Sequence, residues 1–251
     1  MANATIIIPA REGSTRFPGK VLISETGRPL IQHVCEQASR ASCADRLIVA
    51  TDSGKVREAV ERFGGEAVIT RADHANGTSR IAEVAESLDD DIIVNVQGDE
   101  PEIEPELIDA AVDALLAHDD CVVGTAASPF MEDEDPADPN IVKVACDAAG
   151  RALYFSRALI PHYRDAGRSP EGPAQGPLKH VGLYVYRRPF LAEYVRLAPT
   201  PLEQTEQLEQ LRILEHGRRI AVAVRECRFH GIDTPQQYAE FVHRWRAKHG
   251  R

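Results

Sequence analysis

Short apolar runs alternate with amphipathic segments over the first half of the chain. Three of these runs, "TIIIPA", "RLIVAT" and "DIIVNVQ", are almost continuously apolar, as is typical of strands buried on both faces of a sheet. The segments between them repeat their apolar residues with the period of a helix. In chain order the pattern predicts strands at 4–10, 46–52, 66–71, 91–99 and 121–128, and helices at 29–39, 55–63, 78–88 and 105–118. The alternation predicts an α/β fold in which helices cover both faces of a mainly parallel sheet.

The pattern changes after residue 128. The segment "IVKVACDAAGRALYFS" holds two β-type runs around a glycine turn, which predicts a hairpin and a mixed β extension. Residues 166–177 are rich in Pro and Gly and have no period, so we expect a mobile excursion there. "HVGLYVYRR" predicts another strand, and 220–224 and 235–245 predict a last strand and helix. "PLEQTEQLEQLRILEHG" predicts one amphipathic helix. Its apolar face would comprise Leu202, Leu208, Leu211, Ile213 and Leu214, with Glu206 on the solvated flank.

Composition and charge narrow the class of protein. The 251 residues are 43% hydrophobic, enough for the core of one large or two small domains. With 29 basic and 39 acidic residues the net charge is -10, which disfavours a nucleic-acid partner. The five cysteines are scattered without a C-x-x-C pair, so they predict neither a zinc site nor a disulfide framework. The chain shows neither an export signal nor an apolar run long enough to span a bilayer, so we expect a cytoplasmic protein with no membrane partner.

The loop after the first predicted strand, "PAREGSTRFPGK", resembles a phosphate-binding P-loop without matching it. Gly13 and Gly19 enclose five residues where the P-loop has four, and Val21 stands where that motif needs Ser or Thr to hold magnesium. Glycines still let a backbone approach a phosphate, and Arg11 and Lys20 can neutralise its charge. The loop therefore favours an anion site and a simple basic surface loop about equally.

Other polar residues follow the ends of predicted strands, where ligands gather in open α/β sheets. Thr78 and Arg80 open a predicted helix, which suits either an anion or a helix cap by Thr78. Asp99 is placed to bind magnesium. Asp233 could share that metal, although its position favours an N-cap of the last helix. His180, with Tyr184 on the same strand face, could hold a sugar or an acid, although packing is the commoner role.

Seven motifs in order carry a resemblance over nearly the whole chain: "PAREGSTRFPGK", "RADHANGTSR", "VNVQGDEPEI", "ALYFSRALIP", "KHVGLYVYRR", "LEQTEQLEQLRIL" and "GIDTP". The chain closely resembles the 3-deoxy-manno-octulosonate (Kdo) cytidylyltransferases, or CMP-Kdo synthetases. The resemblance implies a nucleotide-diphospho-sugar transferase fold with a Rossmann-like sheet. It also implies magnesium-dependent transfer of CMP from CTP to Kdo, releasing pyrophosphate, for lipopolysaccharide synthesis. A homodimer is expected, built from a single cytidylyltransferase domain at 1–251 whose sugar-binding and dimerisation extension lies at about 129–195.

The resemblance also assigns roles to residues at the matching positions. It implies a CTP site formed by Ala10, Arg11, Ser14, Lys20, Arg71, Asp73, His74, Thr78 and Arg80. It implies a Kdo pocket lined by Gln97, Ser156, Arg157, His180, Tyr184, Glu209 and Gln210. Asp99 and Asp233 would hold Mg²⁺, and Lys20, Arg11 and Asp99 would be the catalytic residues. The expected chemistry is direct in-line attack by the anomeric hydroxyl on the α-phosphorus, which depends on positioning and charge neutralisation rather than on a side-chain base.

Departures from the family pattern leave alternatives open. Phe17, Val21 and Ser79 replace the usual Leu, Pro and acidic residue without removing a proposed ligand. The segment 166–177 precedes His180, so it bears on the shape of the sugar pocket. An 8-amino-Kdo or sialic-acid cytidylyltransferase, a sugar-1-phosphate transferase using UTP or dTTP, and a nucleotide-sensing module without catalysis are the competing hypotheses.

Overall fold

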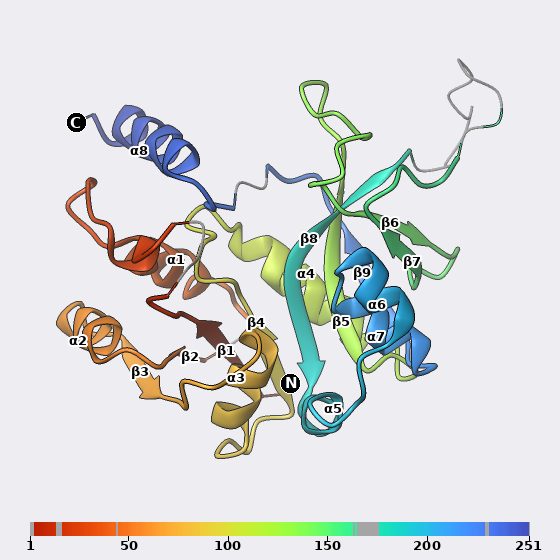
Figure 1. Ribbon diagram of the computed structural model, residues 1–251, viewed down its shortest axis with the longest axis horizontal. Helices are drawn as coiled ribbons and strands as arrows, with labels where there is room; N and C mark the ends of the chain where they lie inside the picture. Colours follow the sequence, from red (N-terminus) through yellow and green to blue (C-terminus); the bar gives the residue numbers. More distant parts are fainter. Residues whose placement is uncertain are drawn as a thin grey trace. The chain divides into compact units, whose positions relative to one another are not determined.

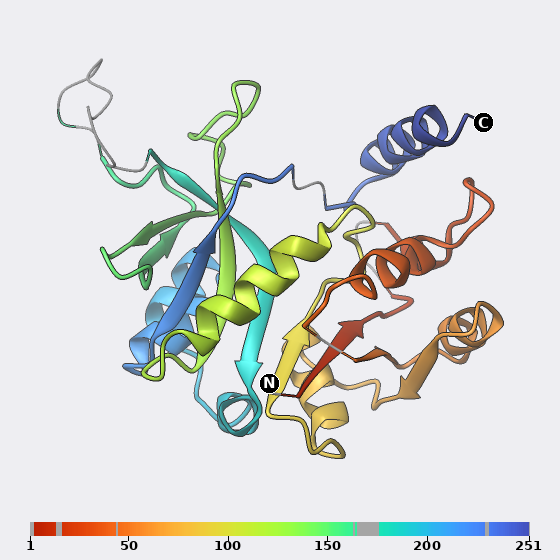
Figure 2. The same cartoon turned by 180° about the vertical axis from the view of Figure 1, so that it is seen from behind.

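The computed structural model describes residues 3–13, 17–43, 45–162, 164, 176–228 and 231–250. Ser14 and most of the excursion predicted at 166–177 lie outside the described residues. The chain divides into two compact units, the first formed by Met1–Asp109 with Arg228–Arg251 and the second by Ala110–Cys227 (Figures 1 and 2). The extension predicted at 129–195 falls within the second unit, and the single domain over 1–251 stays a prediction.

The first unit is built on a four-stranded parallel sheet. Its strands are β1 (Ala4–Pro9), β2 (Arg46–Thr51), β3 (Glu66–Ile69) and β4 (Ile92–Asn95), in the order β3-β2-β1-β4. Helices α1 (Leu30–Ala38), α2 (Gly54–Arg62), α3 (Gly77–Ala85) and α8 (Pro235–His249) and the 3₁₀ turn η1 (Lys20–Leu22) belong to the same unit. Residues 6–8 of β1 are at most 1% exposed, so the prediction of strands buried on both faces is confirmed.

Two helix caps differ from those that the sequence favoured. Asn76 caps α3, because its side chain accepts a hydrogen bond from the backbone N–H of Ser79 at 2.8 Å. Thr234 caps α8 by accepting from Gln237 N at 3.2 Å. The cap roles considered for Thr78 and Asp233 are therefore wrong, and the Asp233 carboxylate is left for another function.

The second unit contains the mixed β extension that the sequence predicted. β5 (Val123–Pro129) pairs in parallel with β9 (Ile220–Val224) and antiparallel with β8 (Leu178–Arg187). β6 (Lys143–Cys146) and β7 (Ala152–Ser156) form the predicted hairpin, and β6 also pairs antiparallel with β8. The helix α4 (Pro105–Leu116), which begins in the first unit, lies along β5 and β8 in both views (Figures 1 and 2). It packs so closely that a Cβ added at Gly124 would lie 2.6 Å from the carbonyl oxygen of Ala111.

The single helix predicted after residue 200 is wrong. The structure has α5 (Arg188–Tyr194) and then two short helices, α6 (Pro201–Glu206) and α7 (Gln210–Glu215), separated by Gln207 at φ 54°. Leu202, assigned to the apolar face, is 39% exposed. The cause of the break lies outside the segment, because the Arg157 side chain takes the carbonyl oxygens of Glu206 at 2.8 Å and Gln207 at 3.4 Å. Those oxygens are the ones a continuous helix would direct to N–H groups four residues later.

None of the helices in the described part of the chain is both long and apolar enough to cross a bilayer.

Candidate active site

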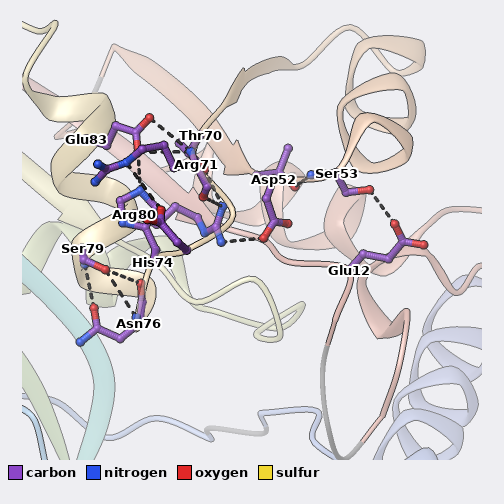
Figure 3. Close-up of polar contacts among 12 residues, drawn as sticks. Glu12, Asp52, Ser53, Thr70, Arg71, His74, Asn76, Ser79, Arg80 and Glu83 are labelled. Atoms are coloured by element: carbon purple, nitrogen blue, oxygen red, sulfur yellow. Dashed lines mark hydrogen bonds and ion pairs between the residues drawn. The ribbon is translucent and has the colours of Figure 1, made fainter.

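The described ends of the opening loop are tied to each other and to α2. Gly19 N donates a hydrogen bond to the carbonyl oxygen of Glu12 at 3.0 Å, and Gly19 adopts the left-handed conformation, with φ 70°. The Glu12 carboxylate accepts from Ser53 Oγ at 2.7 Å (Figure 3) and from Lys55 Nζ at 2.8 Å. Arg11, between the end of β1 and this anchor, is exposed. Glu12 therefore fastens the loop to the start of α2, and the neighbouring Arg11 side chain stays exposed.

Lys20, at the other end of the loop, lies in a cation site built by the rest of the first unit. Its side-chain nitrogen donates to Asp99 Oδ2 at 2.6 Å, to Asp233 Oδ1 at 3.0 Å and to the carbonyl oxygen of Ile232 at 2.8 Å. The two segments that carry these carboxylates are joined by a hydrogen bond from Ile232 N to the Asp99 carbonyl oxygen at 2.9 Å. Lys20 is only 8% exposed. Three predicted site residues from distant parts of the sequence thus converge on one point.

The oxygen donors at Lys20 fit a magnesium ion. Asp99 and Asp233 bind one cation already, since the Lys20 ammonium lies between their carboxylates, and Mg²⁺ characteristically takes one or two protein carboxylates with water and phosphate oxygens. The neighbouring Glu100 is 4% exposed, and both burial and the charge of Asp99 raise the pKa of its carboxyl well above the usual range. Within the described residues no group of three or more His, Cys, Asp or Glu side chains could hold a metal. Magnesium at the Asp99–Asp233 pair stays a prediction that this donor set supports.

Arg80 joins the ends of two strands to the first turn of α3 (Figure 3). It is 4% exposed and donates to Asp52 Oδ2 at 2.8 Å, to the hydroxyl of Thr70 and to the carbonyl oxygen of Arg71 at 3.3 Å. Asp52 follows β2 and Thr70 follows β3, so Arg80 fixes the edge of the sheet at which ligands are expected. The resemblance implies that Arg80 helps to bind CTP, so its guanidinium would bind phosphate while it keeps its contacts to Asp52, Thr70 and Arg71.

The "RADH" segment is fastened to α3 by Glu83. The Glu83 carboxylate contacts His74 Nε2 and accepts from the backbone N–H of Arg71 at 3.3 Å (Figure 3). Burial acts to raise the pKa of Glu83, but these hydrogen bonds lower it below its usual value. The side chains of Arg71 and Asp73 remain 70% and 79% exposed. The segment is thus anchored through its backbone and His74 while two polar side chains stay accessible.

The start of α3 packs directly on the end of β1. A Cβ added at Gly77 would lie 3.2 Å from Cγ of Pro9, so glycine permits this close approach. Thr78, at the next position, is 6% exposed, and Ala10 is 1% exposed. The first-turn N–H groups of α3 therefore lie beside the opening loop, as an anion site requires.

Glu206 organises the residues predicted to line the Kdo pocket in the second unit. Its carboxylate accepts from Ser156 Oγ at 2.7 Å, from the Arg157 backbone N–H at 3.0 Å and from Tyr154 OH at 3.5 Å. The Arg157 guanidinium donates to three carbonyl oxygens, including that of Pro139 at 3.0 Å. Periodicity placed Glu206 on a solvated helix flank, and no sequence signal distinguished it from its neighbours.

Lys143 belongs to the same cluster, because its side chain donates to the carbonyl oxygen of Arg157. Its side chain is 0% exposed, and its ammonium group donates to the carbonyl oxygens of Asp138 at 2.9 Å, Ile141 at 2.6 Å and Arg157 at 2.5 Å. Burial lowers the pKa of Lys143. Together, Lys143, Arg157 and Glu206 join residues 138–141, the end of β7 and the break between α6 and α7 into one cluster.

Thr125 fixes the tautomer of His180, and burial keeps its imidazole neutral. The strand register shifts between Thr125 and Ala126, opposite the residues that precede Tyr184 on β8. The Thr125 hydroxyl lies 2.6 Å from the carbonyl oxygen of Leu183, the preferred acceptor for its single proton, and 2.9 Å from His180 Nε2. His180 Nε2 must then donate, which leaves Nδ1 as an acceptor. Burial lowers the pKa of His180 to about 3, in agreement with a neutral ring.

The remaining predicted sugar residues are distributed over both units. Tyr184 contacts the ring of His180, with the ring centres 5.4 Å apart. Gln210 is 4% exposed at the start of α7, next to the exposed Glu209. Gln97 belongs to the first unit and donates to Asn95 Oδ1 at 3.4 Å. The structure thus gathers Ser156, Arg157, His180 and Tyr184 in the second unit around β7 and β8, while the binding roles of all seven residues stay predictions.

The fold and the cation site define a nucleotidyltransferase-type α/β enzyme. Residues 5–220 match the family described as cytidylyltransferase. The 3-deoxy-manno-octulosonate cytidylyltransferase of Pelobacter propionicus is 50% identical over 98% of both chains. The one from Trichlorobacter lovleyi is 51% identical over 91% of this chain and 93% of its own. A solved CMP:2-keto-3-deoxy-manno-octonic acid synthetase complexed with CTP has a TM-score of 0.91 at 38% identity, covering 98% of this chain and 100% of the other. The chain belongs to the 3-deoxy-manno-octulosonate cytidylyltransferase family.

Proposed function

We propose that the enzyme transfers CMP from CTP to the anomeric hydroxyl of Kdo, giving CMP-Kdo and pyrophosphate for lipopolysaccharide biosynthesis. The observation that carries the proposal is the convergence of Lys20, Asp99 and Asp233, in a chain about half identical to named Kdo cytidylyltransferases over nearly its full length. With Mg²⁺ bound to the two carboxylates, such a site would neutralise the charge of a triphosphate, which is what nucleotidyl transfer demands.

The side chains of the first unit would act by position and charge. Arg11 and Lys20 would bind phosphate oxygens and stabilise the charge that develops on the departing pyrophosphate. Asp99 and Asp233 are the residues that would hold Mg²⁺, which when bound supplies further charge neutralisation at the phosphates. Arg80, with its contacts to Asp52 and Thr70, would keep this edge of the sheet rigid.

The second unit would bind the sugar. His180 Nδ1 would accept a hydroxyl proton of Kdo, because burial keeps the ring neutral and Thr125 places its one proton on Nε2. The Glu206 cluster would hold Ser156 and Arg157 in place around the sugar. No side-chain base is needed if binding aligns the anomeric hydroxyl with the α-phosphorus.

We propose that the enzyme works in the cytoplasm as a homodimer, as expected for the family. The five cysteines are scattered along the sequence without a C-x-x-C pair, which suits reduced thiols in the cytoplasm. Light scattering coupled to size-exclusion chromatography would measure the mass, and a mass of 27.6 kDa, that of one chain, would contradict the dimer.

The proposed function is tested by incubating the enzyme with CTP, Mg²⁺ and one sugar at a time while pyrophosphate release is followed. We expect turnover with Kdo. Turnover only with 8-amino-Kdo or only with sialic acid would reassign the substrate, and faster turnover with UTP or dTTP would reassign the nucleotide. Binding of CTP without any turnover would favour a sensing module.

The metal role of Asp99 has a matched test. Asp99→Asn should abolish turnover without loss of folded structure, whereas Asp113→Asn, the same change at an exposed position on α4, should leave turnover unchanged. Normal activity in the Asp99 variant would remove Asp99 from the metal site.

A further inference from the structure

The Lys20 ammonium group occupies the space between the two carboxylates predicted to hold the metal. Its nitrogen lies 2.6 Å from Asp99 Oδ2 and 3.0 Å from Asp233 Oδ1, and the Ile232 carbonyl oxygen completes its contacts at 2.8 Å. A residue expected to bind the triphosphate is therefore bonded to the two carboxylates predicted to hold the metal.

A divalent cation and this ammonium group cannot both use the two carboxylates in this arrangement. Magnesium binds carboxylate oxygens at about 2.0–2.1 Å, so an ion on either Asp99 Oδ2 or Asp233 Oδ1 would lie within about 5 Å of Lys20 Nζ. Three positive charges would then share a site whose carboxylates carry two negative ones. At that separation the repulsion lowers metal affinity roughly tenfold even when it is screened as in water.

The local structure around Lys20 allows its ammonium group to move away from the two carboxylates. It follows Gly19, whose left-handed conformation ends the loop, and it opens the short turn η1 instead of lying within a long helix. Its side chain is a flexible four-carbon stem ending in a point charge. Rotation of that stem can release the ammonium group without unfolding an element of the sheet.

We propose that Lys20 acts as a stand-in cation for Asp99 and Asp233 in the nucleotide-free enzyme and is displaced when the divalent metal binds. The inference rests on the proposed function, since it assigns the metal to these carboxylates. Metal entry then does two things at once: it binds the aspartates, and it frees the Lys20 ammonium to bind a phosphate of CTP. A nucleotide-free enzyme would consequently bind metal weakly, and metal and nucleotide would favour each other's binding.

The first test measures binding of Mn²⁺ to nucleotide-free protein by electron paramagnetic resonance. Lys20→Met should bind Mn²⁺ roughly tenfold more tightly than the wild type. Lys55→Met removes the same charge from a side chain that is 75% exposed and bonded to Glu12, so it is the matched control and should not change the affinity. Unchanged or weaker binding by Lys20→Met would overturn the proposal. So would a gain that survives in the Lys20→Met/Asp99→Asn double variant, because the metal would then lie elsewhere.

The second test needs no variant and so does not depend on Lys20→Met folding. Acylation of lysine amines, followed by mass spectrometry, reports how accessible Lys20 Nζ is. With 8% exposure, Lys20 should react slowly in metal-free protein and several-fold faster when Mg²⁺ is added, while Lys55 and the buried Lys179 keep their rates. An unchanged rate at metal concentrations that saturate the site would overturn the proposal. Neither readout uses turnover, so a failed pyrophosphate assay and a failed displacement test remain distinguishable.

Discussion

Replacing Thr125 by valine keeps the shape of a fully buried side chain and removes only its hydroxyl. That hydroxyl donates to the carbonyl oxygen of Leu183 at 2.6 Å and accepts from His180 Nε2 at 2.9 Å. The change leaves one buried acceptor and one imidazole N–H without a partner, at about 1–3 kcal/mol each. We expect Thr125→Val to lower the free energy of unfolding by about 2–6 kcal/mol, and the Tm by roughly 4–24 °C.

The chain offers a matched control. Thr5 is also 0% exposed within a strand, but its hydroxyl has no hydrogen-bond partner among the described residues. Thr5→Val removes an unsatisfied polar group, so it should leave stability unchanged or raise it by up to about 1 kcal/mol. Chemical denaturation of both variants gives the comparison. Equal losses in the two variants would refute the hydrogen-bond argument.

Thr125→Val should also affect the sugar and not the nucleotide. One hydrogen bond of about 1 kcal/mol fixes the tautomer of His180, so its loss shifts the tautomer ratio about fivefold and lowers the population with an acceptor at Nδ1. We expect the KM for Kdo to rise several-fold while the KM for CTP stays constant. Correlations between the ring ¹⁵N and ¹H nuclei of His180 report the tautomer directly. Spectra and KM values identical to those of the wild type would show that Thr125 does not position the ring.

Three further predictions concern the second unit. Both ring nitrogens of His118 contact carbonyl oxygens, those of Ala114 at 2.9 Å and Ala149 at 2.8 Å, and these bonds raise the pKa of His118. The stability they add, below about 1 kcal/mol at this partly exposed site, is full below the unfolded pKa of about 6.5 and is lost as pH rises through the folded pKa. His118→Gln should flatten that dependence in urea titrations between pH 5.5 and 8.5, and an unchanged slope would exclude His118 as its source. Gly124→Ala should cost about 1–3 kcal/mol, because its Cβ would meet Ala111 O at 2.6 Å, whereas Gly54→Ala, with nothing within 4 Å, should be neutral by calorimetry. Glu206→Gln should raise the KM for Kdo several-fold without changing the KM for CTP, and equal effects on both substrates would contradict its assignment to the sugar side.

The sequence predicted the parallel core well because local pattern and tertiary burial agree there. In β1 and β2 the apolar run itself is the buried element, so the strands lie within a residue or two of the predicted ranges. The break between α6 and α7 could not be predicted, since it depends on Arg157, some 50 positions earlier in the chain. Local helical periodicity continues through Gln207 and carries no sign of that contact.

For the candidate site, too, the sequence predicted some residues and missed others. Strand-end position indicated Asp99. Asp233 was considered as its metal partner, with an N-cap role favoured until the resemblance assigned it to the metal, and the structure brings both carboxylates to Lys20. Thr125 and Lys143 were missed because their importance comes from hydrogen bonds of their side chains to backbone carbonyls, which leave no periodic or motif signal. Ser14 lies outside the described residues, so its role in binding CTP stays a prediction.

The first unit is made from two stretches of chain that enclose the second unit, and this order has a consequence during synthesis. Lys20 and Asp99 are 79 positions apart, but Lys20 and Asp233 are 213 apart, with all of Ala110–Cys227 between the two carboxylates. A growing chain emerges from the ribosome at about 5–20 residues per second, so the opening loop is made well before the second unit is complete. The predicted catalytic centre is thus among the last parts of the molecule to be assembled. A nascent or truncated chain can carry the loop predicted to bind CTP, yet it lacks Asp233 until the final segment has emerged.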